Sequence, residues 1–387
     1  MAFTYFPLTS AQVAQRRVAW EGLAGKRAFG RAAIRFCSLP SDPEAEREVP
    51  PADEIPLVGP AGTKPEWDSA IRKQVRALHV AAAHRWQDDV FPAIDTPRSI
   101  FGQSQGLAEA FGCKLPQETE PGLYFPVPWI ETAADVDRIK VTPIEKCLYG
   151  QAIEFARYAR AVTGGHLAIR NPVMTGPLDT ANYVLGTTRL MEWTYAEPRA
   201  LKGLLKIITG VLVETLRRLQ AAADGQLCPE VSGCLPRGFG LCSEVRALIS
   251  AEQYAEFEAP YLRQLGAACG PYAIHGCGTW ERTLPALLED HNVMLINFQC
   301  REMDLRKVCA LGGGRLSLSI GRSVELGEKY TWPDAASFYQ YVISTLSEPM
   351  PVELLVYDNN LHDATFLAVQ QQLQGGPSRM FCWRPTR

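Results

Sequence analysis

The sequence lacks an excess of either charge. Its 39 Lys and Arg residues and 42 Asp and Glu residues give a formal net charge of −3, with a pI near 6.1. Proteins that bind nucleic acids usually carry clustered basic residues and a high pI, so we expect no nucleic-acid partner. No apolar run approaches the ~18 residues of a membrane-spanning helix, and the first residues (MAFTYFPLTSAQVAQRR) contain no apolar signal-peptide core. We therefore expect no membrane partner and a cytoplasmic location.

The sequence also lacks a disulfide or zinc-ribbon pattern. It has 11 cysteines, an odd number, and none of them forms a C-x-x-C pair. Reduced thiols in a cytoplasmic protein are the simplest interpretation. We expect most of these cysteines to pack in the core and a few to take part in chemistry.

Nucleotide-binding motifs are absent too. No G-x-G-x-x-G opens a helix after a strand, and there is no G-x-x-x-x-G-K-[ST], which weakens the case for an open nucleotide-binding sheet. From residue 143 to residue 372, short apolar segments typical of strands alternate with helical segments. This alternation indicates βαβ units and a mainly parallel sheet. We predict an α/β fold, a (β/α)8 TIM barrel with an N-terminal helical and loop extension.

The length of 387 residues fits one decorated barrel, because such barrels run from about 250 to over 400 residues. Residues 39–65 are rich in proline and acidic side chains and are expected to form a loop. We therefore expect residues 1–84 to form an N-terminal helical extension with a Pro-rich loop, and residues 85–387 to form the barrel.

Polar residues gather where the expected strands end. In a parallel barrel the active site is built from the loops that follow the strands, so these positions are candidates for function. In chain order they are Arg170, Asn171, Ser243, Glu244, His275, Cys277, Cys300, Glu302, Arg322, Asp358, Asn359, Asn360 and His362. Loops are polar in any protein, so a solvated loop is the alternative interpretation for each of them taken alone.

The sharpest local motif is HGCG at residues 275–278, directly after the strand-like segment YAI. An imidazole and a thiol two residues apart can reach one ion, and zinc favours nitrogen and sulfur ligands. Cys300 ends the next expected strand and would lie beside Cys277 in a barrel. The alternative is a buried histidine and a core cysteine beside a glycine turn.

Three segments, in this order, resemble the uroporphyrinogen decarboxylase superfamily: GPLDTANYVLG at 176–186, LISAEQYAEFEAPY at 248–261, and HGCG at 275–278. The resemblance covers residues 143–372, and more weakly 85–115, and it implies a (β/α)8 barrel. HGCG falls where the corrinoid (cobalamin)-dependent methyltransferase branch carries H-x-C-G. The R-Q-A-G-R motif typical of the true decarboxylases is not found in residues 1–60.

This resemblance implies a methyltransferase that moves a methyl group between a methylcobamide carrier protein, a corrinoid partner, and a thiol or tetrahydrofolate acceptor. Zinc-dependent members hold zinc with H-x-C and a later cysteine near the last strand, where this chain has Asn359. Either Cys300 or His362 replaces that ligand, or the zinc site is lost. In the latter case Asp358 and Asn359 would hold an acceptor by hydrogen bonds.

We therefore expect a corrinoid-linked methyltransferase with zinc as its cofactor, and leave open whether it forms a homodimer. The catalytic candidates are Glu244, Tyr183 and Asn359. The substrate-binding candidates are Arg170, Asn171, Ser243, Arg322, Asp358 and His362, and the metal candidates are His275, Cys277 and Cys300. Two alternatives stay open: a uroporphyrinogen decarboxylase-like decarboxylase of a tetrapyrrole or other polycarboxylate, and a non-catalytic ligand-binding barrel.

Overall fold

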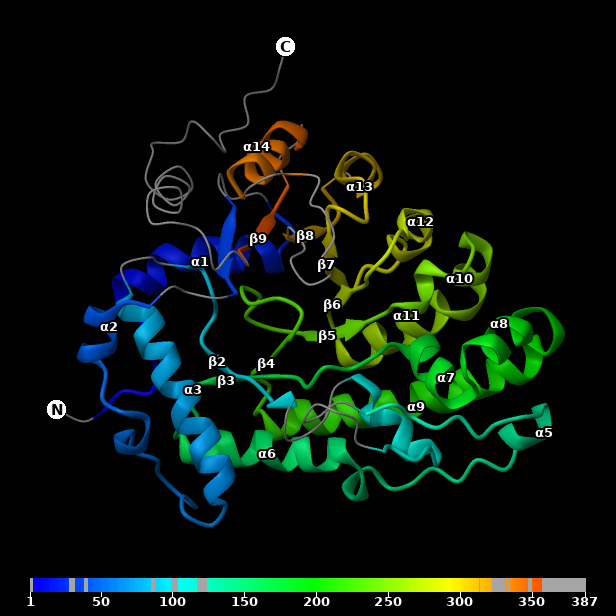
Figure 1. The fold of residues 1–387 in the computed structure, drawn as a ribbon, viewed down its shortest axis with the longest axis horizontal. Coiled ribbons are helices and arrows are strands. Elements are labelled where there is room, and N and C mark those ends of the chain that lie inside the picture. The colour runs from blue at the N-terminus through cyan, green and yellow to red at the C-terminus, as the bar shows by residue number, and fades with distance from the viewer. Residues whose placement is uncertain are drawn as a thin grey trace.

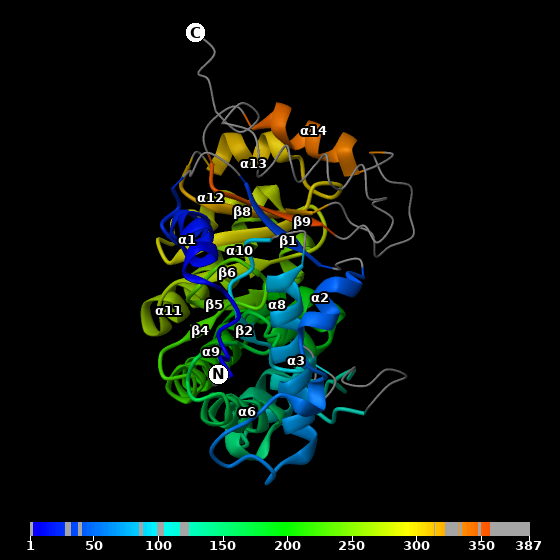
Figure 2. The same cartoon turned by 90° about the vertical axis from the view of Figure 1, so that its left-hand side faces the viewer.

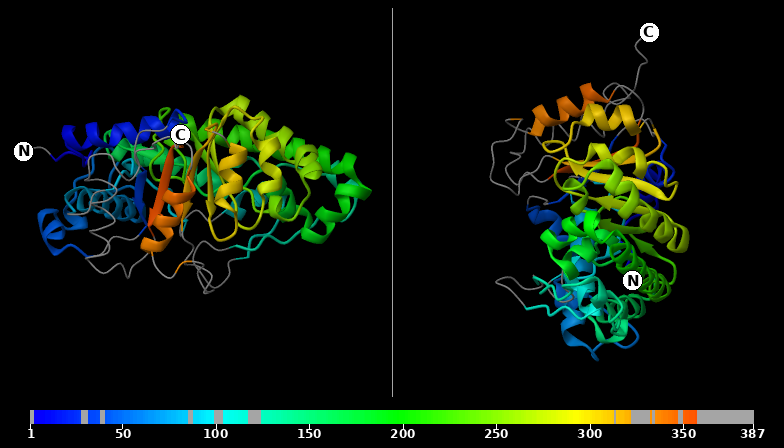
Figure 3. Two further views of the ribbon diagram at one scale, coloured as in Figure 1. Left: turned by 90° about the horizontal axis from the view of Figure 1, so that it is seen from above. Right: turned by 90° about the vertical axis from the view of Figure 1, so that its right-hand side faces the viewer.

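The structure is a computed structural model. It describes residues 3–27, 32–37, 41–84, 88–98, 104–116, 124–312, 314–321, 332, 335–346 and 350–356. Within these residues, short strands lie at the centre and helices surround them (Figure 1). Views from the two sides and from above show helices on the outside of the strands as well (Figures 2 and 3). None of the helices in these ranges is long and apolar enough to cross a membrane.

The strands pair in parallel and form two sheets. The larger has the order β1-β9-β8-β7-β6-β5, and the smaller has the order β2-β3-β4. Their bounds are β1 (Ala33–Phe36), β2 (Ala93–Ile94), β3 (Ala168–Arg170), β4 (Leu227–Cys228), β5 (Phe239–Cys242), β6 (Tyr272–His275), β7 (Val293–Gln299), β8 (Ser317–Gly321) and β9 (Val352–Val356). The prediction of an α/β fold with parallel strands is confirmed.

The two sheets approach each other at both edges. The Asp89 amide, on the segment that leads into β2, donates to the Ile34 carbonyl of β1 (2.8 Å). At the other edge, Thr175 forms an isolated parallel bridge with Cys242 of β5. In the described residues these contacts join the two sheets, but no strand of one sheet pairs along its length with a strand of the other. The strands therefore form a ring that regular strand pairing does not close.

Helices follow the strands around the ring. The outer layer in Figure 1 runs from α3 past α6 and α9 to α10–α14. The helices are α1 (Ser10–Ala24), α2 (Pro43–Glu48), α3 (Pro65–Ala83), α5 (Ala133–Val136), α6 (Leu148–Val162), α7 (Pro177–Leu185), α8 (Thr187–Ala196), α9 (Pro198–Ala222), α10 (Ala251–Phe257), α11 (Ala259–Cys269), α12 (Leu284–Leu287), α13 (Leu305–Gly312) and α14 (Ala335–Thr345). A capping box opens α10, because the side chains of Ser250 and Gln253 each accept from the other's backbone amide.

The faces of the strands differ in chemistry. Outward residues of β5–β8, such as Leu241, Ile274 and Ile296, are fully buried under the helices. The opposite face carries a polar row at one level, because these residues are in-register partners on neighbouring strands. The row consists of Cys242, His275, Asn297, Ser319 and Glu353. The interior of the ring is therefore polar at the level where β5 and β6 end.

The N-terminal segment lies at the other end of the strands. Leu23 and Trp20 of α1 pack in one apolar cluster with Ala273 and Leu295, which precede His275 and Asn297 on the inner face. The Ser317 hydroxyl at the start of β8 donates to the Leu23 carbonyl (2.6 Å). Helix α1 thus covers the amino ends of the strands and leaves the carboxyl ends to the candidate site.

The N-terminal region differs from the sequence prediction in two places. Residues 33–36 form β1 and pair with β9, where helix and loop alone were expected. The Pro-rich stretch contains α2, which Asp42 caps by accepting from the amides of Glu44 and Ala45. Both elements are short, and an amphipathic pattern needs more residues than either provides. The division of the chain near residue 84 stays a prediction.

Candidate active and metal site

Three side chains at the carboxyl ends of β5 and β6 lie close enough to hold one metal ion. They are Glu244, His275 and Cys277, whose ligand atoms all lie within 4.8 Å of one another. His275 Nε2 lies 3.4 Å from Cys277 Sγ and 3.4 Å from Glu244 Oε1. The His275 side chain is 21% exposed and the Glu244 side chain 41%, so a ligand can reach the group from solvent. We call these three residues the metal triad.

Short backbone segments hold the metal triad in place. Glu244 also accepts a hydrogen bond from the Cys277 amide (2.7 Å), which ties the loop after β5 to the turn after β6. Glu302, on the loop after β7, accepts from the Gly278 amide (2.8 Å). Gly278 has φ +79°, a backbone conformation that side chains with a Cβ rarely adopt. The HGCG turn is therefore fixed by the carboxylates on either side of it.

Gly276 allows a close approach that no other residue would permit. A Cβ at this position would lie 2.6 Å from Arg246 Nη2 and 2.8 Å from the Ser243 carbonyl oxygen. The Arg246 guanidinium lies 3.4 Å from the centre of the Trp280 ring, and the Trp280 indole donates to the Gly276 carbonyl (3.0 Å). Arg246 and Trp280 therefore form a packed floor under the His-Gly-Cys turn.

Two buried carboxyl groups lie beneath the metal triad. Asp179 Oδ1 accepts from the amides of Glu244 (2.8 Å) and Val245 (3.2 Å). Burial raises the pKa of Asp179 to about 7, and the nearby Glu244 charge adds to the rise. Burial likewise raises the pKa of Glu258 to about 8, with Asp179 adding to it. Glu258 accepts from the Leu178 amide (2.8 Å). Two neighbouring carboxyl groups with raised pKa values are typical of functional sites.

The donor set of the metal triad fits zinc. Imidazole nitrogen, thiolate sulfur and carboxylate oxygen are the three ligand types zinc takes in proteins. A neutral imidazole nitrogen and a carboxylate oxygen that face each other at 3.4 Å are both acceptors, so a proton or a cation must lie between them to relieve the repulsion. A metal ion satisfies all three donors at once.

Cys300 lies outside this group. It is buried, and its electrostatic neighbours are Cys309 on α13 and Tyr341 on α14. Burial raises the pKa of Cys300 well above its usual range, which disfavours the thiolate form that binds metal. The expected proximity of Cys300 to Cys277 is not found, because Cys300 follows the inward Gln299 and points to the helices. Among the described side chains, the third possible metal ligand is Glu244, which was predicted as a catalytic residue.

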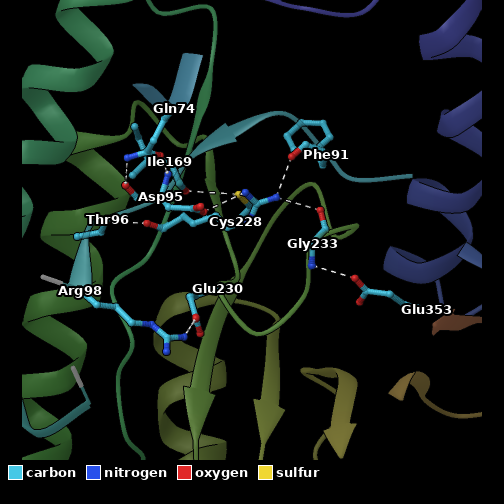
Figure 4. Close-up of polar contacts among 11 residues, drawn as sticks. Gln74, Phe91, Asp95, Thr96, Arg98, Ile169, Cys228, Glu230, Gly233 and Glu353 are labelled. Atoms are coloured by element: carbon cyan, nitrogen blue, oxygen red, sulfur yellow. Dashed lines mark hydrogen bonds and ion pairs between the residues drawn. The ribbon is translucent and has the colours of Figure 1, made fainter. Parts of the chain in front are cut away.

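The predicted substrate-binding residues that the structure describes are engaged in structural hydrogen bonds. The Arg170 guanidinium, on β3, binds Asp95 and the carbonyls of Phe91 and Gly233 (Figure 4). Asn171 exchanges hydrogen bonds with Gly240 of β5 (2.8 and 3.1 Å). The Ser243 hydroxyl lies 3.5 Å from Glu258. Arg170 and Asn171 thus join strands, and Ser243 lies beside the buried Glu258 carboxyl group.

The remaining predicted residues lie elsewhere. Tyr183 is half-buried on α7 and is an electrostatic neighbour of Tyr149. The other five lie outside the described residues: Arg322, Asp358, Asn359, Asn360 and His362.

Four residues of the site were not predicted: Asp179, Arg246, Glu258 and Asn297. Asn297 was recognisable as the one polar residue in the strand VMLINF. Asp179 and Glu258 lie inside the segments that carry the family resemblance. No feature of the sequence identified Arg246 as a site residue, because an arginine in a loop is ordinarily exposed to solvent.

Two known methyltransferases are similar to this chain. The chain is 28% identical over 192 residues to a methylated-thiol–coenzyme M methyltransferase of Methanosarcina mazei; the match covers 46% of this chain and 46% of that protein. The chain thus spans about half the length of this curated relative. A solved methyltransferase from Methanosarcina mazei superposes with a TM-score of 0.61 at 13% identity, covering 92% of this chain and 98% of that one.

The family match covers the region that contains the metal triad. Residues 99–310, more than half of the chain, match the family described as uroporphyrinogen decarboxylase (URO-D). They include β5, β6 and β7, and therefore Glu244, His275 and Cys277. The family predicted from the three ordered motifs is confirmed: the chain belongs to the uroporphyrinogen decarboxylase (URO-D) family.

Proposed function

We propose that this protein is a methyltransferase that transfers a methyl group between a corrinoid carrier protein and a small thiol acceptor. The observation that carries the proposal is the metal triad at the carboxyl ends of the strands in a URO-D family chain. The names of the methyltransferases to which the chain is similar support the reaction class. A thiol fits this donor set better than tetrahydrofolate, because sulfur is a favoured zinc ligand.

Glu244, His275 and Cys277 would hold zinc, with one position left for the acceptor. When bound, zinc lowers the pKa of a coordinated thiol, so that the acceptor is a nucleophilic thiolate at neutral pH. Glu244 fixes the turn through the Cys277 amide, and the exposure of Glu244 and His275 leaves the group open to the barrel mouth. The corrinoid carrier would dock there, because the acceptor would be held at this opening.

The first test is metal content. Protein purified without chelator is analysed for zinc, and the variants His275→Ala and Cys277→Ala are compared with Cys309→Ala, which removes a partly exposed thiol outside the site. We expect about one zinc per wild-type and Cys309→Ala chain and less than a tenth of that in the two triad variants, because each of these loses a direct ligand. Full loading in both triad variants would contradict the assignment.

The second test follows the reaction. Methylcobalamin is incubated with the protein and small thiols, and the cobalt oxidation state is followed by absorbance. We expect demethylation that depends on thiol and falls at least 100-fold in His275→Ala. Decarboxylation of a tetrapyrrole with no methyl transfer would instead support the decarboxylase alternative.

A further inference from the structure

Asn297 is an unusual residue for its position. It lies in the middle of β7 between the apolar residues Ile296 and Phe298, and it is 8% exposed. A buried amide persists only when its donors and acceptor have partners. Its neighbours in register are His275 on β6 and Ser319 on β8.

The orientation of the Asn297 amide follows from its partners on β8. Its Nδ2 lies 3.1 Å from the Ser319 carbonyl oxygen and 2.9 Å from the Ser319 hydroxyl. A carbonyl can only accept, so the amide nitrogen must be the atom that faces β8. The carbonyl oxygen Oδ1 therefore faces the other way, toward β6.

This orientation determines which nitrogen of His275 carries the proton. Asn297 Oδ1 lies 2.5 Å from His275 Nδ1, and Oδ1 can only accept. A neutral imidazole has one N–H, so that hydrogen is on Nδ1 and the lone pair is on Nε2. Nε2 is the atom that faces Cys277 Sγ and Glu244 Oε1. Metal-binding histidines usually have their other ring nitrogen held in this manner.

We propose that Asn297, itself oriented by Ser319, is a positioning residue that fixes His275 in the tautomer whose Nε2 accepts a metal ion. The metal part rests on the function proposed above, whereas the tautomer part rests on the hydrogen bonds between β6, β7 and β8 alone. Three neighbouring strands at the centre of Figure 1 thus supply ligand, orienting amide and anchor in that order.

The tautomer is measured on metal-free protein. Nitrogen-15 NMR of labelled histidine, at a pH where the ring is neutral, separates the two tautomers, and His275→Gln identifies the signal among the six histidines. We expect the Nδ1–H form in the wild type and a mixture in Asn297→Leu. A wild-type His275 with its proton on Nε2 would overturn the proposal whether or not the protein binds zinc.

The consequence for metal binding is measured by competition with a chelating dye. We expect Asn297→Leu to weaken zinc binding about 10- to 100-fold, Ser319→Ala to weaken it less, and Asn297→Asp to restore most of it, since a carboxylate still accepts from Nδ1. The matched control is Gln299→Leu, two residues further along the same face of β7. Thermal unfolding shows that each variant is folded.

The outcomes are distinguishable. Unchanged zinc affinity in a folded Asn297→Leu variant overturns the positioning role. The expected tautomer in a wild type that binds no zinc refutes the metal part and the proposed function together, while the orientation by Asn297 stands. Substitution with Co²⁺ adds a second readout, because its visible spectrum shifts with the orientation of the imidazole ligand.

Discussion

Two buried arginines in this ring of strands have opposite surroundings. Arg170 on β3 binds Asp95 and the carbonyls of Phe91 and Gly233, and it crosses between segments of the smaller sheet (Figure 4). Arg246, beneath the metal triad, is fully buried, and its three guanidinium nitrogens have no hydrogen-bond partner among the described residues. It rests on the face of Trp280 instead.

The difference in hydrogen bonding means that burying Arg246 costs more folding free energy than burying Arg170. A buried charge without hydrogen bonds costs free energy, and burial lowers the pKa of Arg246 accordingly. Its surroundings share the feature, since Asp179 Oδ2 and the Tyr254 hydroxyl also have no hydrogen-bond partner in the described part of the chain. Arg170 Nε also has no hydrogen-bond partner among the described residues, but its Nη1 and Nη2 are bonded, so Arg170 joins segments of the chain. The unsatisfied groups around Arg246, in contrast, lie beside the metal triad.

The sharpest way to break this comparison is to remove Arg170. We expect Arg170→Met to lower the free energy of unfolding by about 3–5 kcal/mol, because the buried Gly233 carbonyl and the partly buried Phe91 carbonyl lose a charged donor. Denaturant unfolding measures the change. The control is Arg98→Met. The Arg98 side chain, which pairs with Glu230, is more than half exposed, so its removal should lower the free energy of unfolding by less than about 1 kcal/mol. Equal losses in both variants would remove the distinction.

The acidic pair beneath the site predicts a pH dependence. Asp179 has a raised pKa of about 7, so between about pH 4 and pH 7 the folded state holds a proton that the unfolded state releases. Stability therefore falls as the pH rises through this interval. We expect Asp179→Asn to flatten this slope by about 1.4 kcal/mol per pH unit, which denaturation at several pH values measures. A slope unchanged in the variant argues that Asp179 is ionised.

Removing Arg246 should cost much less than removing Arg170. We expect Arg246→Met to change the free energy of unfolding by about 1 kcal/mol or less near pH 6, because an apolar side chain of similar length can still pack on Trp280 and replaces a buried charge that has no hydrogen bonds among the described residues. Zinc affinity should nevertheless fall, since the floor under Gly276 changes. A loss as large as that of Arg170→Met would show that the two arginines have the same structural role.

The smallest effect is expected at Cys300. Its thiol packs near Cys309 and Tyr341, so Cys300→Ala should cost about 1 kcal/mol of stability and leave zinc binding unchanged. Dye competition and thermal unfolding measure the two quantities. Weaker zinc binding in this variant would restore Cys300 to the ligand set.

The sequence predicted the parallel α/β architecture because its buried strands are continuous apolar runs between helices of ordinary length. It predicted His275 and Cys277 because two ligand types lie on one short turn. It misplaced Cys300, because the face of a strand end depends on register, and a one-residue difference turns a side chain from the interior to the helices. Arg246 and Asp179 could not be found, because their roles come from burial by segments distant in the chain.

The pairing of β1 with β9 constrains how this chain can fold. Residues 33–36 are synthesised early, yet their partner, residues 352–356, leaves the ribosome more than 300 residues later. Until then the edge of β1 that pairs with β9 stays open to other contacts, although the strands that α1 covers have already been synthesised. A chain interrupted before residue 352 would therefore expose a free strand edge at β1, which favours aggregation. Chaperone dependence during synthesis is the expected cost of joining the first strand to the last.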